Sequence, residues 1–377
     1  MAKRKGKSRY RIKDYQQRYH ADGDFDPDEA VRKGFIRREF KIPTRELSAG
    51  AEGLSDLPRA EGMVLGQFPG GAMVRVKGKQ LLCGISGTYR PPEGQSALAL
   101  GDIVTVALIR PEHLDGKLEI DKDRADGVIL ERQLRQTALC RPQPTSSRKR
   151  DNQAEIFEKV IVANMDTLLI VASPCQPEVR PGVIDRFLII AERGELKPVL
   201  IINKIDLAKP DKTMLTHFQD LHLEILQCSA AKATGLRAVK RQLKGLKSVL
   251  AGPSGVGKST LINAIIPGAK AETRSVRHKD NRGRHTTSTA TVYDMPTGGI
   301  IVDTPGLREL GLAIEPGELP WYFPEFEELA NQCQFRNCTH THEPRCAVLA
   351  AVEAGKIPQR RYDSYTNILA TLDRPGS

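Results

Sequence analysis

The sequence lacks the apolar segments that membrane insertion or export requires. It contains no run of about 18 or more apolar residues, and its most apolar stretch, VIVANMDTLLIVA, is interrupted by Asn164 and Asp166. The basic N-terminus is not followed by an apolar segment, which argues against a signal peptide. We therefore expect a cytoplasmic protein that does not associate with membranes, and we expect it to act as a monomer.

The cysteines do not suit a disulfide framework. There are seven of them, an odd number, and three lie close together between Cys333 and Cys346. This distribution favours a metal site in a protein from a reducing compartment. The other four lie in or near apolar runs and are predicted to be small core residues: Cys83, Cys140, Cys175 and Cys228.

Aromatic residues are also scarce, whereas positive charge is in excess. Aromatics make up 5% of the chain, so the stacking platforms that single-stranded nucleic acid uses are few. The net charge is +11, which favours a polyanionic partner, although solubility alone is an alternative explanation. The first twenty residues hold eight Lys or Arg and one Asp, so much of the excess lies at the N-terminus.

Composition and periodicity predict a multidomain chain with four segments. Residues 1–60 are rich in charge, Gly and Pro, and predict a basic, largely disordered arm. Residues 61–140 contain short β-rich runs separated by glycine turns, which predict an OB-type β-barrel, with an SH3-like barrel as the alternative. Residues 141–316 begin with a polar linker at Arg141 and continue as an α/β domain. Residues 317–377 predict a helical module that contains the cysteine cluster.

Within residues 141–316, apolar runs alternate with amphipathic segments. This alternation predicts a mainly parallel sheet whose loops gather at the carboxyl ends of its strands. The predicted helix at 181–196 would bury Ile184, Phe187, Leu188 and Ala191, and the helix at 235–245 would bury Leu236, Val239 and Leu243. The remaining predicted helix is 258–266, and the predicted strands are 167–173, 198–207, 223–230, 247–255, 290–295 and 299–306.

One loop of this domain has the sequence of a phosphate-binding loop. The segment GPSGVGKS satisfies G-x-x-x-x-G-K-[ST] between a predicted strand and a predicted helix. Lys258 would pair with the β- and γ-phosphates of a nucleotide, and the Ser259 hydroxyl would bind Mg²⁺. The predicted binding residues are Gly252, Pro253, Ser254, Gly255, Val256, Gly257, Lys258, Ser259 and Thr260.

Three further short motifs follow predicted strands. The Asp206 carboxylate can accept two hydrogen bonds from guanine N1–H and its amino group, and adenine does not offer this pair of donors. Asp303 would reach Mg²⁺ through a water, and the amide of Gly306 would meet the γ-phosphate. Together these motifs predict a GTP site with Asn203, Lys204, Ile205 and Asp206, then Ser229 and Ala230, whose backbone N–H would contact guanine O6, and then Asp303 and Gly306.

The order of these motifs is the reverse of that in ordinary GTPases, because the base-reading tetrad precedes the phosphate loop. With a β-barrel in front and CQFRNCTHTHEPRC behind, the chain resembles the RsgA/YjeQ family of circularly permuted GTPases over about residues 60 to 370. The resemblance implies a Mg²⁺-dependent GTP hydrolase that the small ribosomal subunit stimulates. It also implies a role in late maturation of that subunit, with rRNA binding and release on hydrolysis.

The polar segment 277–289 predicts a mobile loop that γ-phosphate and Mg²⁺ would order. Thr287 is the predicted Mg²⁺ ligand, with Thr286 as the close alternative, and a plain surface loop is the competing interpretation. Where many GTPases carry a water-positioning Gln, this chain has Leu307. His285 is therefore the candidate for orienting the attacking water, and the family's pattern matches it. The predicted catalytic residues are His285, Thr287 and Lys258.

The cysteine cluster offers three thiolates and one imidazole, which favours a closed, structural zinc site. Buried free cysteines with an exposed histidine pair are the alternative, and His342 competes with His340 as a ligand. The resemblance implies a zinc site at this pattern and favours His340. The predicted set is Cys333, Cys338, His340 and Cys346, and the predicted cofactors are GTP, Mg²⁺ and one structural Zn²⁺.

Two other functions remain open from the sequence. The chain could be an RNA-binding scaffold that binds GTP with little hydrolysis, which Leu307 favours. It could also be a permuted GTPase of large-subunit assembly or of a membrane process, although the barrel and the cysteine cluster argue against this.

Overall fold

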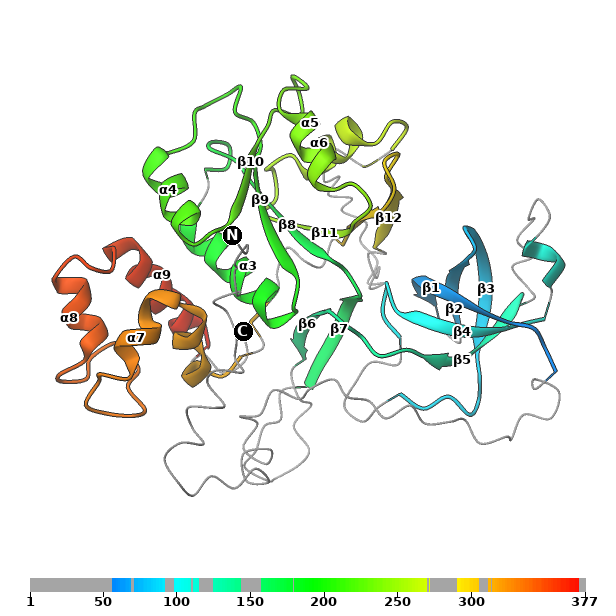
Figure 1. Cartoon of the computed structure of the whole chain (residues 1–377), viewed down its shortest axis with the longest axis horizontal. Helices are drawn as coiled ribbons and strands as arrows, with labels where there is room; N and C mark the ends of the chain where they lie inside the picture. The colour runs from blue at the N-terminus through cyan, green and yellow to red at the C-terminus, as the bar shows by residue number, and fades with distance from the viewer. Residues whose placement is uncertain are drawn as a thin grey trace, which may run out of the picture.

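A computed structural model describes most of the chain beyond the predicted arm (Figure 1). Because 1–55 and 272–289 are outside the described residues, the predicted arm up to residue 55 and the predicted switch with His285, Thr286 and Thr287 are outside them too. The described residues are 56–68, 71–91, 98–109, 111–114, 125–143, 157–178, 180–269, 271, 290–304, 311–312 and 314–372.

The first five strands form a closed barrel in the order β1-β2-β3-β5-β4. Strand β3 pairs in parallel with β5, whereas β1 pairs antiparallel with both β2 and β4 and so closes the barrel. This confirms the predicted five-stranded barrel, and its order is that of the OB type. The strands are β1 (Arg59–Phe68), β2 (Gly71–Val76), β3 (Lys79–Ile85), β4 (Ile103–Leu108) and β5 (Gly127–Arg132), and the short helix η2 (Pro111–Leu114) follows β4.

Alternating apolar residues fill the barrel, as strand geometry requires. Val64, Val74, Leu81, Val104 and Ile129 are all fully buried in one cluster. The β-rich runs separated by glycine turns are therefore the strands of this barrel.

A two-stranded ribbon connects the barrel to the next domain. Strand β6 (Ala138–Gln143) pairs antiparallel with β7 (Phe157–Ala163). The prediction of a linker from Arg141 was wrong for residues 141–143, and the predicted boundary at 140/141 falls inside β6. Pro142 and the polar composition suggested a linker, but a proline is tolerated in a strand with a free edge. The predicted arm likewise ends inside β1, which begins at Arg59.

The second domain is built on a six-stranded sheet in the order β10-β9-β8-β11-β13-β12. All neighbouring strands are parallel except β12 and β13. The sheet therefore confirms the predicted, mainly parallel α/β architecture. Its strands are β8 (Thr167–Ala172), β9 (Lys197–Ile202), β10 (Glu224–Gln227), β11 (Lys247–Ala251), β12 (Thr291–Asp294) and β13 (Ile300–Asp303).

Helices cover both faces of this sheet, which explains why β8 is buried along its whole length. Helix α3 (Pro181–Arg193) and α4 (Lys212–Asp220) lie on one face, and α5 (Leu236–Gln242) and α6 (Lys258–Ile265) lie on the other. As predicted, Ile184, Phe187 and Ala191 are buried on α3. Leu188 is only half-buried, although it packs against the same core, and the buried face of α3 also includes Asp185.

The C-terminal segment is a helical module packed against α3, on the left in Figure 1. Arg361, itself buried, hydrogen-bonds Asp185 of α3, and its Nε lies 2.8 Å from Glu325 Oε1. Its guanidinium carbon lies 4.3 Å from the centre of the Phe323 ring. The buried cation is thus paired and stacked, which fixes the module on α3. The helices are η4 (Pro316–Tyr322), η5 (Pro324–Phe326), α7 (Glu327–Ala330), α8 (Ala347–Glu353) and α9 (Gln359–Leu372).

Candidate nucleotide site and metal centre

The described GTP-site motifs lie at one edge of the sheet. Because β8, β9, β10, β11 and β13 run parallel, the segments that follow them leave the sheet on the same side. Asn203 follows β9, Ser229 follows β10 and Gly252 follows β11, while Asp303 is the last residue of β13. The reversed motif order therefore does not prevent the motifs from meeting.

The buried side chain of Asn203 joins three of these loops. Its Nδ2 donates to the Val256 carbonyl at 3.0 Å and to that of Gly257 at 3.5 Å, both in the predicted phosphate loop. Its Oδ1 accepts from the Ala230 amide at 3.0 Å. One amide side chain thus uses its donor and its acceptor to hold the base-reading loops against the phosphate loop.

The Ala230 amide is therefore occupied, which affects the predicted contact with guanine O6. The loop closes on itself between Ser229 and Thr234 through two backbone hydrogen bonds of 3.0 and 3.1 Å, and Ser229 Oγ accepts from the Lys232 amide at 3.1 Å. Within the described chain, the Ala231 amide has no hydrogen-bond partner. It is the next donor on this loop.

The phosphate loop requires glycine at the predicted positions. Gly252 has φ +136°, and a Cβ there would lie 2.2 Å from the Val171 carbonyl oxygen. Gly257 has φ +92°, and a Cβ there would meet Asn203 Nδ2 at 2.4 Å. Left-handed glycines without side chains leave a backbone concavity of the kind that binds phosphate. The loop therefore fits the polyphosphate of a nucleotide.

Lys258 is the first residue of α6, and its side chain is buried over the loop. Its Nζ donates to the carbonyls of Gly252 and Pro253, at 2.7 Å each. The ammonium group is therefore held at the loop itself. Ser259 and Thr260 follow in the first turn of α6 and are half-buried, Val256 anchors the loop in the core, and Ser254 and Gly255 are exposed.

The other three residues of the tetrad, Lys204, Ile205 and Asp206, are less buried than Asn203. Lys204 has φ +61°, and its Nζ donates to the Gln176 carbonyl at 2.5 Å. The Ile205 amide donates to the Cys228 carbonyl at 3.3 Å, which holds the tetrad on β10. Asp206 is exposed. Its carboxylate is therefore accessible to a ligand.

The segment after β8 also borders the site, and sequence reasoning missed it. Pro177 Cδ lies 3.3 Å from the position that a Cβ of Gly255 would take, and Gln176 accepts the Lys204 hydrogen bond. Its position could have been inferred from the sequence, because residues 173–178 follow a buried strand of the same parallel sheet. Its sequence, SPCQPE, matches no nucleotide motif.

The described residues include only part of the predicted Mg²⁺ and hydrolysis sites. Asp303 is half-buried at the end of β13. The hydroxyl of Ser259 and the carboxylate of Asp303 are oxygen donors of the kind that Mg²⁺ prefers, and they belong to the same sheet edge. Gly306 and Leu307 lie outside the described residues, as do His285, Thr286 and Thr287.

The four predicted metal ligands form one cluster. Their ligand atoms all lie within 4.8 Å of one another. His340 Nδ1 is 3.4 Å from Cys346 Sγ and 3.5 Å from Cys333 Sγ, and the two sulfurs are 3.9 Å apart. A tetrahedral zinc ion with ordinary bond lengths places two sulfurs about 3.8 Å apart, and a sulfur and a nitrogen about 3.5 Å apart. The cluster, which also includes Cys338, therefore fits zinc.

The surroundings of the cluster affect the protonation of its ligands. Burial lowers the pKa of His340 despite the charge of Glu343, so its imidazole is neutral and able to ligate. Burial raises the pKa of Cys338 to about 12, so this thiol stays protonated unless a bound cation displaces its proton. His342 is exposed, and its Nδ1 lies 2.9 Å from Thr341 Oγ1, outside the cluster.

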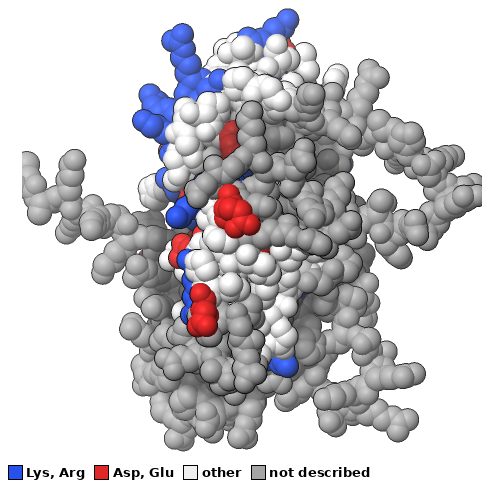
Figure 2. Space-filling model, turned by 90° about the vertical axis from the view of Figure 1, so that its right-hand side faces the viewer, with Lys and Arg blue, Asp and Glu red and all other residues white. Residues whose placement is uncertain are grey.

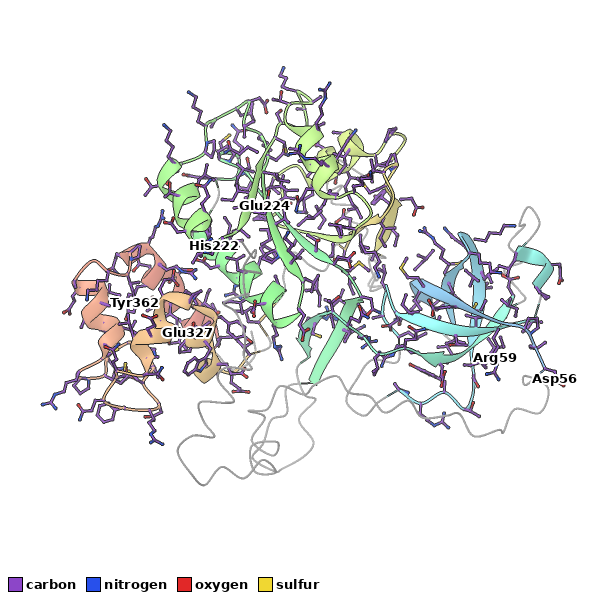
Figure 3. The ribbon with its side chains drawn as sticks, viewed as in Figure 1. Asp56, Arg59, His222, Glu224, Glu327 and Tyr362 are labelled. Carbon is purple, nitrogen blue, oxygen red and sulfur yellow. The ribbon has the colours of Figure 1, made fainter. Side chains whose placement is uncertain are left out.

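The cluster is fixed by the helices of the C-terminal module, where Figure 3 labels Glu327 and Tyr362. Tyr362 Oη donates to the His340 carbonyl at 2.9 Å, and Tyr365 Oη donates to the Thr339 carbonyl at 2.7 Å. The Phe326 ring packs edge-on against His340 at 5.8 Å. The ligand geometry is therefore imposed by α9 and η5.

The other four cysteines differ from this cluster. Cys83 and Cys228 are buried as predicted, and burial raises their pKa values to about 12 and about 11, respectively. Cys140 and Cys175 are only half-buried. None of the helices in the described part of the chain combines the length and apolarity that crossing a membrane needs.

Comparison with known proteins agrees with this geometry. The family model described as RsgA GTPase matches residues 134–313. The small ribosomal subunit biogenesis GTPase RsgA of Gemmatimonas aurantiaca is 42% identical over 214 residues, which cover 56% of this chain and 70% of that protein. The protein of the same name from Chlorobaculum tepidum is 36% identical over 291 residues, which cover 76% and 89%.

Solved structures extend the similarity to most of the chain. YjeQ from Thermotoga maritima is 32% identical with a TM-score of 0.60, and the match covers 84% of this chain and all of that one. YloQ, a circularly permuted GTPase, is 24% identical with a TM-score of 0.56 and supports the fold alone. From the motifs, the fold and these relatives, the chain belongs to the RsgA GTPase family.

Proposed function

We propose that this protein is a GTP hydrolase stimulated by the small ribosomal subunit, that it binds the rRNA of that subunit late in maturation, and that hydrolysis releases it. GTP binding is supported above all by the hydrogen bonds of the Asn203 side chain, which hold the tetrad, the Ser229–Ala230 loop and the phosphate loop together. The ribosomal part is supported by membership in a family whose relatives are named small ribosomal subunit biogenesis GTPases.

The residues at the sheet edge take separate roles in this proposal. The exposed carboxylate of Asp206 reads the guanine N1–H and amino group. Because the Ala230 amide is occupied by Asn203, the Ala231 amide takes the contact with guanine O6. Lys258 moves its ammonium group from the loop carbonyls to the β- and γ-phosphates.

Ser259, Asp303 and Thr287 would hold Mg²⁺, with Thr286 as the alternative to Thr287. The ion would neutralise charge that develops on the phosphate oxygens. Because Leu307 cannot hydrogen-bond a water, His285 orients the nucleophile, and Gly306 contacts the γ-phosphate. Such positioning by a single loop residue implies slow intrinsic turnover, which a partner accelerates.

Zinc at Cys333, Cys338, His340 and Cys346 has a structural role, because its four ligands leave no open position for a substrate. The barrel, the zinc module and the basic arm supply contacts to RNA. We further propose that the protein works in the cytoplasm as a monomer.

The decisive experiment is GTP turnover titrated with purified small ribosomal subunits. The expected result is a low intrinsic rate that rises to saturation with small subunits and does not rise with large subunits. The same assay with Lys258→Ala should give no turnover. A flat trace in all conditions would instead support an RNA-binding scaffold that holds GTP. Preference for ATP over GTP would contradict the assigned base contacts.

The arm is tested by deletion of residues 1–55. We expect affinity for different RNAs to fall roughly uniformly, because unspecific phosphate contacts are lost, while GTP hydrolysis is retained. Loss of GTP hydrolysis as well would place the arm within the fold of the GTPase domain.

A further inference from the structure

Helix α5 and its flanking turns carry a row of exposed cations. The exposed residues are Lys232 before the helix, Arg237 and Arg241 within it, and Lys244 just after it. Arg237, Arg241 and Lys244 follow the i, i+4, i+7 spacing, which places them along one side of the helix. We call these four residues the α5 basic stripe. They lie on the sheet face opposite α3 and the zinc module.

The sequence around the α5 basic stripe lacks negative charge. The sequence contains no Asp or Glu from residue 225 to residue 271, a range that includes all of α5 and α6. Helix α6 packs beside α5, so the neighbouring helix adds no carboxylate. Among the described residues, none of the four stripe side chains has an ion pair or a hydrogen bond. Ordinary solvated helix faces intersperse both signs of charge, so this face is unusual.

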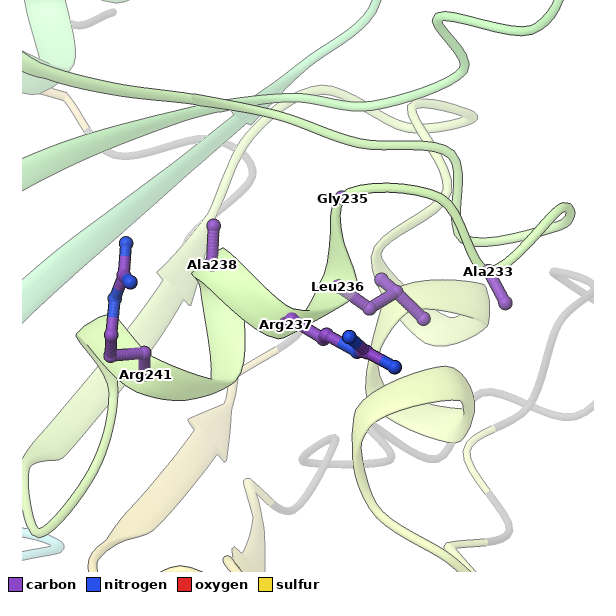
Figure 4. A pocket seen from close by; sticks show the side chains of 6 residues that line it. All are labelled: Ala233, Gly235, Leu236, Arg237, Ala238 and Arg241. Atoms are coloured by element: carbon purple, nitrogen blue, oxygen red, sulfur yellow. The ribbon is translucent and has the colours of Figure 1, made fainter.

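Two of the stripe residues border a hollow of about 640 Å³. Figure 4 shows the guanidinium groups of Arg237 and Arg241 pointing away from each other, with Ala238 between the two side chains and Leu236 beside Arg237. The remaining lining residues, Ala233 and Gly235, carry no charge. The hollow begins at the 229–234 turn, which carries the proposed guanine contacts. A ligand in it would therefore lie beside the nucleotide site.

Positive charge is also distributed unevenly on the wider surface. In Figure 2, Lys and Arg gather mainly toward the top of the molecule, the end at which Figure 1 places α5 and α6. Acidic side chains lie mainly lower on the same face. A polyanion that approaches the upper end of this face is attracted.

We propose that the α5 basic stripe binds phosphate groups of RNA. It would be a contact separate from the barrel and the zinc module, and the choice of RNA as the polyanion rests on the proposed function. Guanidinium groups bind phosphate through two parallel hydrogen bonds, and two of the four cations are arginines. The hollow contains no aromatic side chain, so bases do not stack there. The contact therefore positions the protein on RNA without reading its sequence.

The test replaces Arg237 and Arg241 with Gln in the full chain and measures the salt dependence of binding. The probes are purified small ribosomal subunits and a short RNA duplex. Each lost phosphate contact lowers the slope of log K against log[salt] by about 0.9, so the double variant should lose about 2. Its affinity near 100 mM salt should fall by about tenfold or more. GTP affinity and intrinsic hydrolysis should match the wild-type protein.

Two further variants keep this test specific. Lys197→Gln with Lys212→Gln removes the same charge from exposed positions at the start of β9 and on α4, and it should keep the wild-type slope. Arg237→Lys with Arg241→Lys keeps the charge and should also keep the slope. If the lysine variant loses the slope as fully as the glutamine variant, the loss is structural and the proposal is wrong.

Other outcomes separate this proposal from the function it rests on. An unchanged slope for the glutamine variant on both probes overturns it. The proposal is also overturned if the glutamine variant keeps the wild-type slope on RNA but loses binding to polyglutamate or to anionic lipid vesicles. The partner would then be an acidic protein or a membrane. The glutamine variant could show a reduced slope on the duplex while the wild-type protein does not bind small subunits. This result would support RNA binding by the α5 basic stripe and contradict the ribosomal function.

Discussion

Arg75 of the barrel and Asp294 of the sheet form a two-point ion pair between the two domains. Nη1 of Arg75 lies 2.5 Å from Asp294 Oδ1, and Nη2 lies 3.1 Å from Oδ2. Asp294 is the last residue of β12, whose first residue, Thr291, pairs with Asp303 of β13. The barrel is thus joined to the strand between the predicted switch segment and the predicted Mg²⁺ carboxylate.

Breaking this pair should weaken the response to the small ribosomal subunit. Exposed ion pairs contribute up to about 1 kcal/mol, so we expect the stimulated rate of GTP hydrolysis to fall by at most about fivefold. Arg75→Ala, Asp294→Ala and the double variant should lose the same fraction, because all three remove one pair. Lys212→Ala, at an exposed cation on α4 outside the proposed RNA contacts, serves as the control and should have no effect. Additive losses in the double variant would show that the two residues act independently.

Asn203→Ala should weaken GTP binding without unfolding the protein. The substitution leaves the Ala230 amide and the carbonyl of Val256 without their partner. An unsatisfied buried polar group costs about 1–3 kcal/mol, so affinity should fall by about tenfold to a hundredfold. Titration with a fluorescent GDP analogue measures this. Asn331→Ala, at an exposed amide just after α7, is the control, and wild-type affinity in Asn203→Ala would mean that the network does not organise the site.

The GTP site could be predicted from the sequence because its determinants are local. Each motif is a short run after a buried strand, and parallel strands bring their carboxyl ends together whatever the chain order. The cysteine cluster was also local, since its four ligands lie within one short segment. Type, spacing and strand context were therefore sufficient to predict that the tetrad, the Ser229–Ala230 loop and the phosphate loop lie together, and that the four Cys and His residues cluster.

Contacts between distant segments gave no such signal. Arg75 and Asp294 are 219 positions apart, and neither belongs to a motif. Arg361 and Asp185 are 176 positions apart and likewise could not be paired from the sequence. The use of the Ala230 amide by Asn203 depends on the loop conformation, which the residue types do not determine. Strand β6 was missed because its pairing with β7, rather than its composition, makes it a strand.

His285→Ala should reduce stimulated GTP hydrolysis and leave GTP affinity at the wild-type level. A positioned side chain that assists proton transfer or orients water contributes about a hundredfold or more, and Leu307 cannot replace it. Single-turnover hydrolysis with saturating small subunits measures the rate, and equilibrium titration measures the affinity. His278→Ala, in the same segment, should retain the wild-type rate. A collapse of affinity in His285→Ala would indicate a structural role.

Cys346→Ser should release the zinc ion and destabilise the C-terminal module. Replacing one thiolate of a closed four-ligand site weakens the metal, and its binding energy stabilises the fold. Zinc content by atomic emission should fall from one ion per chain, and the midpoint of thermal unfolding should fall with it. Cys140→Ser and His342→Ala are the controls, because both residues lie outside the cluster. Full zinc content in Cys346→Ser would contradict the assigned ligand set.

Glu343 should stabilise the zinc loop in a pH-dependent way. Burial alone would raise the pKa of its carboxyl, but hydrogen bonds from Thr339 Oγ1, the Thr339 amide and the His342 amide outweigh burial and hold the pKa far below its ordinary value. A carboxyl with a lowered pKa in the folded state contributes stability that is fully present above its ordinary pKa of 4.5 and is lost as the pH falls toward the lowered value.

Glu343→Gln should therefore lower the thermal unfolding midpoint near neutral pH, and the difference from wild type should narrow as the pH falls below 4.5. Zinc ligands also take up protons in acid, but they do so in both proteins, so the difference between the two curves isolates Glu343. Glu353→Gln, at an exposed glutamate at the end of α8, should show no such difference. A gap that stays constant across the whole pH range would mean that Glu343 acts through its shape and hydrogen bonds, and that its charge contributes nothing.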